Sequence, residues 1–291
     1  MRRYKDATAL RRALETRLKQ ESDSTGRDLG RLRRRVVFDR LTVRLSVDDG
    51  AQWILKGGAA LEFRLGGRAR ATKDLDLAVA NDATDGLAVR ELLIDALTED
   101  PDGDWFSFQV REPVVLAVDG GGRGAWRFPV EAWLAGKAFA SIRLDVAARG
   151  EELAVTEQLE LPGSLAFADI PARSIKAVER RQHFAEKLHA LTRDYGDRPN
   201  TRVKDLVDLV LLIEDGLRPD KALVDVVRHV FTIRDTHPCS VTVPDPPPRW
   251  RIEYPELADG LTETGSDLPS ALKLLRGFWS AAHDDASGTE H

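Results

Sequence analysis

The sequence is poor in cysteine and has no long hydrophobic run. Its 291 residues include one cysteine, Cys239, which excludes an internal disulfide framework and a cysteine-rich zinc site. The uninterrupted apolar runs, such as LVLLI at 209–213, are far shorter than the roughly 18 residues that a membrane-spanning helix needs. The first residues, MRRYKDATAL, lack the apolar segment of a secretory signal. We therefore expect a cytoplasmic protein that makes no membrane contact.

Signatures of several common enzyme classes are also missing. The sequence has no G-x-x-x-x-G-K-S/T phosphate-binding loop, no G-x-S-x-G nucleophile elbow and no G-x-G-x-x-G motif after a strand. Its histidines include no H-x-x-x-H pair that could bind zinc from one helix. The main sequence evidence for a P-loop ATPase, an α/β-hydrolase, a dehydrogenase or a zinc enzyme is therefore absent.

The net charge of -5 conceals a segregation of charge along the chain. Residues 1–50 hold 14 Lys and Arg against 8 Asp and Glu, and residues 173–204 hold 9 basic against 4 acidic residues. An arginine stripe at 27–44 and a basic segment at 173–204 thus flank an acidic middle. Such stripes could contact the phosphate backbone of RNA, or they could be helix surfaces solvated by arginine.

Hydrophobic periodicity predicts helices at both ends of the chain and strands between them. Leu10, Leu14 and Leu18 recur at helical spacing, and the pattern predicts helices at 6–21 and 28–46. In the middle of the chain, segments in which apolar and polar residues alternate, as in strands, are interspersed with short helical patterns. Its expected elements are a strand at QWIL, a helix at AALEFRLGG, a strand at TKDLDLAV, a helix at 85–99, and strands at 105–111, 113–118 and 138–149, with GGGRG at 120–124 as an exposed turn.

From about residue 172 the patterns become helical. We expect helices over 174–194, over TRVKDLVDLVLLIEDGL, in further segments to about 236, and over 268–282, with PDPPPRW at 244–250 as an extended loop. The fold class is therefore α+β. The predicted domains are a helical N-terminal region at 1–50, an α/β core at 51–165 and a helical C-terminal domain at 166–291.

Three acids and a glycine pair could bind a metal-loaded nucleotide. Gly57 and Gly58 lie between a strand and a helix, where a phosphate could approach backbone N–H groups. Asp74 and Asp76 leave the same face of one strand, and such like charges repel unless a cation neutralises them. The strand at 138–149 delivers Asp145 to a polar face. This pattern predicts a metal site.

Lys187 and Asp208 lie on two predicted helices. Lys187 borders an apolar stripe, so it could act on a substrate or be an ordinary lysine whose stem covers the core. Asp208 sits in the apolar run KDLVDLVLL, where an unpaired carboxylate would be costly. Lys204, one turn earlier, or Lys187 could pair with it. We expect these side chains and the acids of the strands to gather around one magnesium-loaded pocket.

Four blocks in order, LKGGAALEFRL, RATKDLDLAV, FAEKLHALTRD and KDLVDLVLL, resemble the AbiEii-type (MenT-like) nucleotidyltransferase toxins. These belong to the DNA polymerase β-like nucleotidyltransferase superfamily, and the resemblance covers about residues 50–215. It implies a polymerase-β-like core with a mixed sheet, flanked by a helical N-terminal extension and a helical C-terminal domain. It also implies a toxin with a cognate antitoxin, which transfers a nucleoside monophosphate from an NTP to RNA, with the tRNA 3′ end as acceptor, and releases pyrophosphate.

The resemblance also implies roles for individual residues. Gly57 and Gly58 match the nucleotide-gripping turn, and Thr72 matches the Ser/Thr before the acid pair. The remaining matches concern metal and phosphate: Asp74 and Asp76 as ligands of Mg²⁺ or Mn²⁺, Asp145 as the third carboxylate, Lys187 as the lysine that holds the triphosphate, and Asp208 as the second acid of its block.

Two other functions stay open. One is a catalytically idle module that binds RNA or protein on a transferase scaffold. The other is a sugar-nucleotide glycosyltransferase, in which an acid-x-acid pair also binds metal beneath a diphosphate. The second leaves Lys187 and KDLVDL unexplained.

Overall fold

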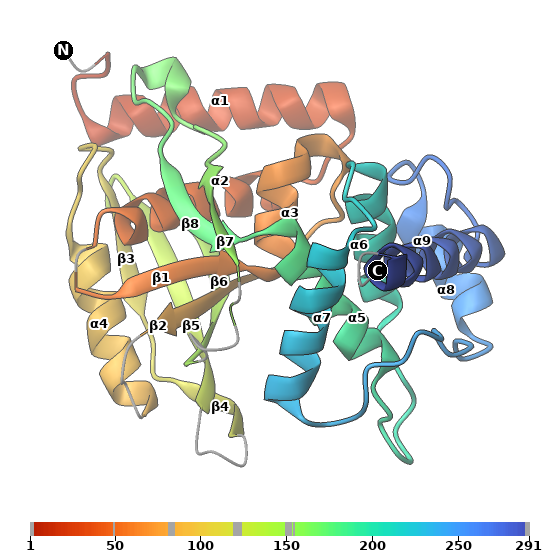
Figure 1. The fold of residues 1–291 in the computed structure, drawn as a ribbon. Helices are drawn as coiled ribbons and strands as arrows, with labels where there is room; N and C mark the ends of the chain where they lie inside the picture. Colours follow the sequence, from red (N-terminus) through yellow and green to blue (C-terminus); the bar gives the residue numbers. More distant parts are fainter. Residues whose placement is uncertain are drawn as a thin grey trace. The chain divides into compact units, whose positions relative to one another are not determined.

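The computed structural model describes residues 3–48, 50–80, 85–118, 124–148, 153 and 155–288 (Figure 1). Helices and a mixed sheet confirm the predicted α+β class. The chain forms two compact units. The first comprises Met1–Arg64, Ala71–Gly150 and Gln158–Ala177, and the second Leu65–Arg70, Glu151–Glu157 and Val178–His291. The N-terminal helices therefore belong to the same unit as the sheet.

The sheet has the strand order β3-β5-β6-β2-β1-β8-β7, with β4 paired to β5. Strand β1 pairs antiparallel with β2, β2 parallel with β6, and β5 antiparallel with β6. The strands are β1 (Gln52–Lys56), β2 (Asp74–Ala80), β3 (Phe106–Val110), β4 (Val114–Val118), β5 (Gly124–Leu134), β6 (Lys137–Ala147), β7 (Thr156–Glu160) and β8 (Ser174–Val178).

Helices of the first unit pack against this sheet. Helix α2 packs on β6, α4 on β3 and β5, and α1 on α2. Leu10, Leu14 and Leu18 are buried on α1, as their spacing predicts. These helices are α1 (Ala7–Thr25), α2 (Leu29–Ser46), α3 (Gly57–Leu65) and α4 (Gly86–Thr98), with short 3-10 turns η1 (Gly66–Arg68) and η3 (Ala166–Ala168).

The second unit is helical. Helix α6 packs against α5, α8 and α9, and α7 packs against α5 and α9. Its helices are α5 (Arg180–Thr192), α6 (Val203–Glu214), α7 (Lys221–Arg234), α8 (Trp250–Ala258) and α9 (Leu268–Gly288). Among the helices described in the two units, none has the length and apolar character needed to cross a bilayer.

One local prediction is wrong. Residues 174–178 form strand β8 and not the start of a helix, because Ile175 and Ala177 are buried and alternate with exposed Ser174 and Lys176. Helix α5 begins only after Glu179, whose side chain accepts a hydrogen bond from the Arg181 N–H. The predicted loop is confirmed over 244–249, and helix α8, which was not predicted, begins at Trp250 although Pro255 within it disfavours a helix.

Three further elements differ from the predictions because they were not predicted or are longer than predicted. Strands β5 and β7 were not predicted as separate elements, and α9 continues to Gly288 instead of ending at 282. The predicted turn at 120–124 lies outside the described residues except for Gly124.

Candidate functional site

The acid pair lies on the polar face of β2. Leu75 and Leu77 are buried on one face of this strand, while Asp74 and Asp76 leave the other face and are partly exposed. The alternation of TKDLDLAV therefore correctly predicts how these four side chains are divided.

Asp145 lies directly beside Asp76. The two residues are partners in the parallel register of β2 and β6, and Asp74 is the partner of Arg143. Lys56 on β1 faces Asp76 from the other side, and Arg127 on β5 is the partner of Asp145. Side chains of paired residues leave the same face of a sheet, so a row of charged groups crosses four strands.

Two arginines, which the sequence did not single out, contact these acids. Arg127 donates from Nε to Oδ1 and from Nη2 to Oδ2 of Asp145, at 2.7 Å each. Its Nη2 lies 3.9 Å from Oδ2 of Asp74. The Arg143 Nε donates to Oδ1 of Asp74. The hydrogen bond to Asp145 raises the pKa of Arg127, so Arg127 stays charged.

Gly57 begins α3 directly after β1 and touches Asp76. Its φ of +63° is in the left-handed region that favours glycine. A Cβ at this position would lie 2.0 Å from Oδ2 and 2.8 Å from Cβ of Asp76. Gly58 follows as a buried residue of the first helical turn. The carboxylate of Asp76 thus packs on the turn where α3 exposes its backbone N–H groups.

Thr72 fixes the start of β2. Its hydroxyl donates to the Asp74 carbonyl oxygen at 3.0 Å and accepts from the Asp74 N–H at 3.4 Å. The residue is buried, with 7% of its surface exposed. These bonds orient the backbone that carries Asp74.

Lys187 and Asp208 meet in the second unit. The Lys187 Nζ lies 2.7 Å from Oδ1 of Asp205 and 2.9 Å from Oδ2 of Asp208. Arg70 donates from Nε and Nη2 to the two oxygens of Asp208, at 2.8 Å each. Asp208 is fully buried, and its pairing with Lys187 is confirmed, whereas Lys204 is exposed.

The pKa values follow from this pairing. Burial by itself would lower the pKa of Lys187, but Asp208 and Asp205 outweigh it and raise the pKa above its ordinary value. Burial would raise the pKa of Asp208, but Lys187 and Arg70 outweigh it and lower the pKa. Each partner therefore keeps the other charged, which removes the cost of an isolated buried charge.

A family model decides the family. The model of the nucleotidyl transferase AbiEii toxin of type IV toxin–antitoxin systems matches residues 41–283. The chain belongs to this family. As an AbiEii-family member it is a nucleotidyltransferase-like toxin of a type IV toxin–antitoxin system. No curated protein matches the sequence significantly.

Several solved structures are similar to this AbiEii-family chain. JHP933 from Helicobacter pylori has 14% identity over 89% of this chain and 95% of its own, with a TM-score of 0.48. A candidate nucleotidyltransferase from H. pylori has 16% identity, 89% and 98% coverage, and a TM-score of 0.47. An antigenic nucleotidyltransferase-like protein from Paracoccidioides brasiliensis has 15% identity, 69% and 88% coverage, and a TM-score of 0.41.

The acids of β2 suit the divalent metal that nucleotidyltransferases use. Carboxylate oxygens are the ligands that Mg²⁺ and Mn²⁺ prefer, and Asp74 and Asp76 present them on one partly exposed face. Within the described ranges, no group of three or more His, Cys, Asp or Glu side chains could hold a metal by itself. A cation bound by two carboxylates would complete its coordination with substrate phosphate and water.

Some residues of the basic stripes of this AbiEii-family protein are buried. Arg40 and Arg44 of the stripe at 27–44 are buried, and they pair with Asp39, Asp102 and Asp104. Their predicted contact with RNA is therefore wrong. In the segment 173–204, the exposed basic residues are Lys176, Arg193, Arg198, Arg202 and Lys204.

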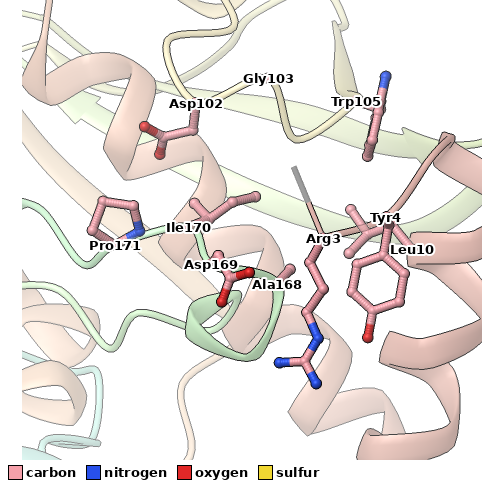
Figure 2. Close-up of a pocket in the computed structure, with 10 residues that line it drawn as sticks. All are labelled: Arg3, Tyr4, Leu10, Asp102, Gly103, Trp105, Ala168, Asp169, Ile170 and Pro171. Carbon is pink, nitrogen blue, oxygen red and sulfur yellow. The ribbon is translucent and has the colours of Figure 1, made fainter. Parts of the chain in front are cut away.

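A small cavity of the first unit holds none of the predicted site residues. Figure 2 shows its lining, which includes Arg3, Tyr4, Asp102, Trp105 and Asp169. Its volume is about 150 Å³, whereas small-molecule sites usually measure roughly 300–1,000 Å³. Asp102 is also occupied, because its carboxylate pairs with Arg173 and Arg40. This cavity is too small for a nucleotide.

Proposed function

We propose that this AbiEii-family protein transfers a nucleoside monophosphate from an NTP to RNA, with the tRNA 3′ end as acceptor, and releases pyrophosphate. One observation carries the proposal. Asp74 and Asp76 share a polar face with the Gly57 turn, whose missing side chain lets Asp76 lie against the first residue of α3. Such a turn beside paired carboxylates can receive a metal-bound polyphosphate.

Asp74 and Asp76 would hold a divalent cation, Mg²⁺ or Mn²⁺. Bound there, the cation would supply charge neutralisation at the polyphosphate and lower the pKa of the acceptor hydroxyl. Gly57 and Gly58 would let the polyphosphate approach the backbone N–H groups of α3. Thr72 would keep Asp74 in place through its hydrogen bonds to the Asp74 backbone.

Lys187 would bind the negative charge of the triphosphate and of the departing pyrophosphate. Its raised pKa keeps the ammonium charged, which that role requires. Asp208 and Asp205 would hold the ammonium in place through contacts of 2.9 and 2.7 Å. The family resemblance supports this role, and the buried pairing supports Asp208 as the residue that positions Lys187.

RNA as the acceptor is supported by the resemblance and by the exposed basic residues of the segment 173–204. Contacts between such residues and phosphates dominate the affinity of proteins for RNA. The type IV toxin–antitoxin family implies a cognate antitoxin as the partner.

Incorporation of label from each α-³²P NTP into total tRNA, with Mg²⁺ present, tests the proposal. We expect the wild-type protein to incorporate label into tRNA. For Asp74→Asn we expect the rate of incorporation to fall by more than about 100-fold, since a metal ligand acts directly on the charge that develops in the reaction. Asp95→Asn, at an exposed position of α4, is the matched control and should retain activity. Equal incorporation by Asp74→Asn would overturn the assignment. Transfer from a labelled sugar nucleotide would favour the glycosyltransferase, and no transfer at all the idle module.

A further inference from the structure

Asp145 turns both of its oxygens to Arg127 rather than leaving them for a cation. The two side chains form a bidentate pair at 2.7 Å for each contact, across neighbouring positions of β5 and β6. Bidentate pairs of arginine with carboxylate fix the guanidinium in one plane and one direction. Asp145 therefore determines where the positive charge of Arg127 lies.

The charge of Arg127 lies beside the acid pair. Its Nη2 is 3.9 Å from Oδ2 of Asp74, and Asp76 is the direct neighbour of Asp145 in the sheet. The Arg127 side chain is 30% exposed, so a ligand can reach it. A guanidinium has five N–H donors, and the two bonds to Asp145 use two of them.

A phosphate is the ligand that this arrangement fits. Arginine binds phosphate oxygens through its planar donors, and its charge does not depend on pH in the ordinary range. Before a substrate arrives, Arg127 and Arg143 offset the repulsion between the acids, since Arg143 pairs with Asp74. A phosphate that binds with a cation would bring negative charge to Arg127 and positive charge to the acids.

We propose that Arg127 binds a phosphate group of the substrate beside Asp74 and Asp76, and that Asp145 is the residue that positions Arg127. The inference rests on the proposed function for its substrate. The phosphate belongs either to the NTP or to the backbone of the acceptor RNA. This assigns Asp145 a different role from the metal ligand that the family resemblance implies.

Equilibrium binding to the full-length protein tests the two sources of phosphate without any need for turnover. A fluorescent NTP and a labelled tRNA are the probes, and electron paramagnetic resonance measures Mn²⁺ binding without nucleotide. For Arg127→Gln we expect a Kd about 10-fold higher for one of the two probes, which is the loss of roughly one charge-assisted hydrogen bond. The probe whose Kd changes identifies the source. Arg127→Lys should give a smaller change, because it keeps the charge and loses the bidentate pair.

The role of Asp145 is tested in the same assays. Asp145→Asn should raise the same Kd by less than Arg127→Gln does, and it should add nothing in the Arg127→Gln background, because it acts through Arg127. It should leave Mn²⁺ binding unchanged, whereas Asp76→Asn should abolish it. Arg111→Gln breaks an exposed pair with Glu131 in the same sheet and is the matched control.

Two results would overturn the inference. One is an unchanged Kd for both probes in Arg127→Gln, and the other is loss of Mn²⁺ binding in Asp145→Asn to the extent seen for Asp76→Asn. Thermal unfolding checks that each variant folds, and Arg127→Lys replaces Arg127→Gln if the latter does not. If the wild-type protein transfers no nucleotide but its phosphate binding depends on Arg127, the proposed function fails and the inference stands.

Discussion

Gly57 and Asp76 are packed so closely that a single methyl group cannot be placed between them. The Cβ of an alanine at position 57 would lie 2.0 Å from Oδ2 and 2.5 Å from Cγ of Asp76. The contact joins the start of α3 to Asp76, which lies two positions after Asp74 on β2. The turn and the acid pair are therefore one structure, and a change at Gly57 has to change the position of Asp76.

Gly57→Ala should move Asp76 and weaken metal binding. We expect Mn²⁺ affinity to fall by about 10-fold or more, as for the loss of one charged ligand contact. We also expect a loss of about 1–3 kcal/mol of unfolding free energy from the strained φ and the clash. Gly136→Ala is the control, because Gly136 also has a positive φ of +68° but has no atom within 4 Å of the added Cβ. Wild-type Mn²⁺ affinity in Gly57→Ala would contradict this prediction.

Asp208→Asn should destabilise the protein strongly. The carboxylate is fully buried and pairs with both Lys187 and Arg70, so its removal takes a counter-charge from two cations at once, although Lys187 keeps its contact with Asp205. Breaking a buried pair by removing one partner costs about 3–5 kcal/mol. Urea unfolding measures the loss. Asp225→Asn breaks the exposed pair with Lys221 and should cost at most about 1 kcal/mol. Similar losses for the two variants would count against a tightly coupled buried cluster.

The same cluster should make stability depend on pH at both extremes. Because the folded pKa of Asp208 lies below its ordinary value of 3.8, its contribution is present above about that pH and is lost as the pH falls through the lowered value. The folded pKa of Lys187 lies above 10.5, so its contribution is present below that pH and is lost as the pH rises through the raised value. The difference in unfolding free energy between wild type and Asp208→Asn should be constant from about pH 5 to 9 and shrink below pH 4. A constant difference down to pH 2 would argue against the ionised pair.

Substitution of exposed basic residues should weaken RNA binding, whereas substitution of a buried basic residue should lower stability. Arg198→Gln with Lys204→Gln should weaken tRNA binding and lower the slope of log K against log salt by roughly 0.7–0.9 for each lost phosphate contact. Arg44→Gln should instead lower stability, because Arg44 is buried and pairs with Asp104 at 2.8 Å. Filter binding at several salt concentrations measures the slope, with Lys273→Gln on α9 as the control. An unchanged slope in the double variant would remove these residues from the RNA contact.

Local patterns predicted the parts of the site that depend on neighbouring residues in the chain. The spacing of Asp74 and Asp76 within TKDLDLAV gave their shared face, because side chains alternate along any strand. The apolar run around Asp208 required a cationic partner, because a buried carboxylate is unstable without one. These are properties of short segments and hold in any fold that keeps the segment a strand or a helix.

The sequence by itself determined most of the helices, strands β1–β4 and β6, the polar face of β2 and the need to pair Asp208. Only the tertiary structure decided the partners. Arg70 reaches Asp208 across 138 positions of sequence, and Arg127 meets Asp145 through the register of β5 with β6. It also decided that 174–178 is a strand, through the pairing of Ala177 with Leu55. Strand register and long-range ion pairs depend on how the whole core packs. The residues of a short segment therefore do not show which distant residues will contact it in the folded protein.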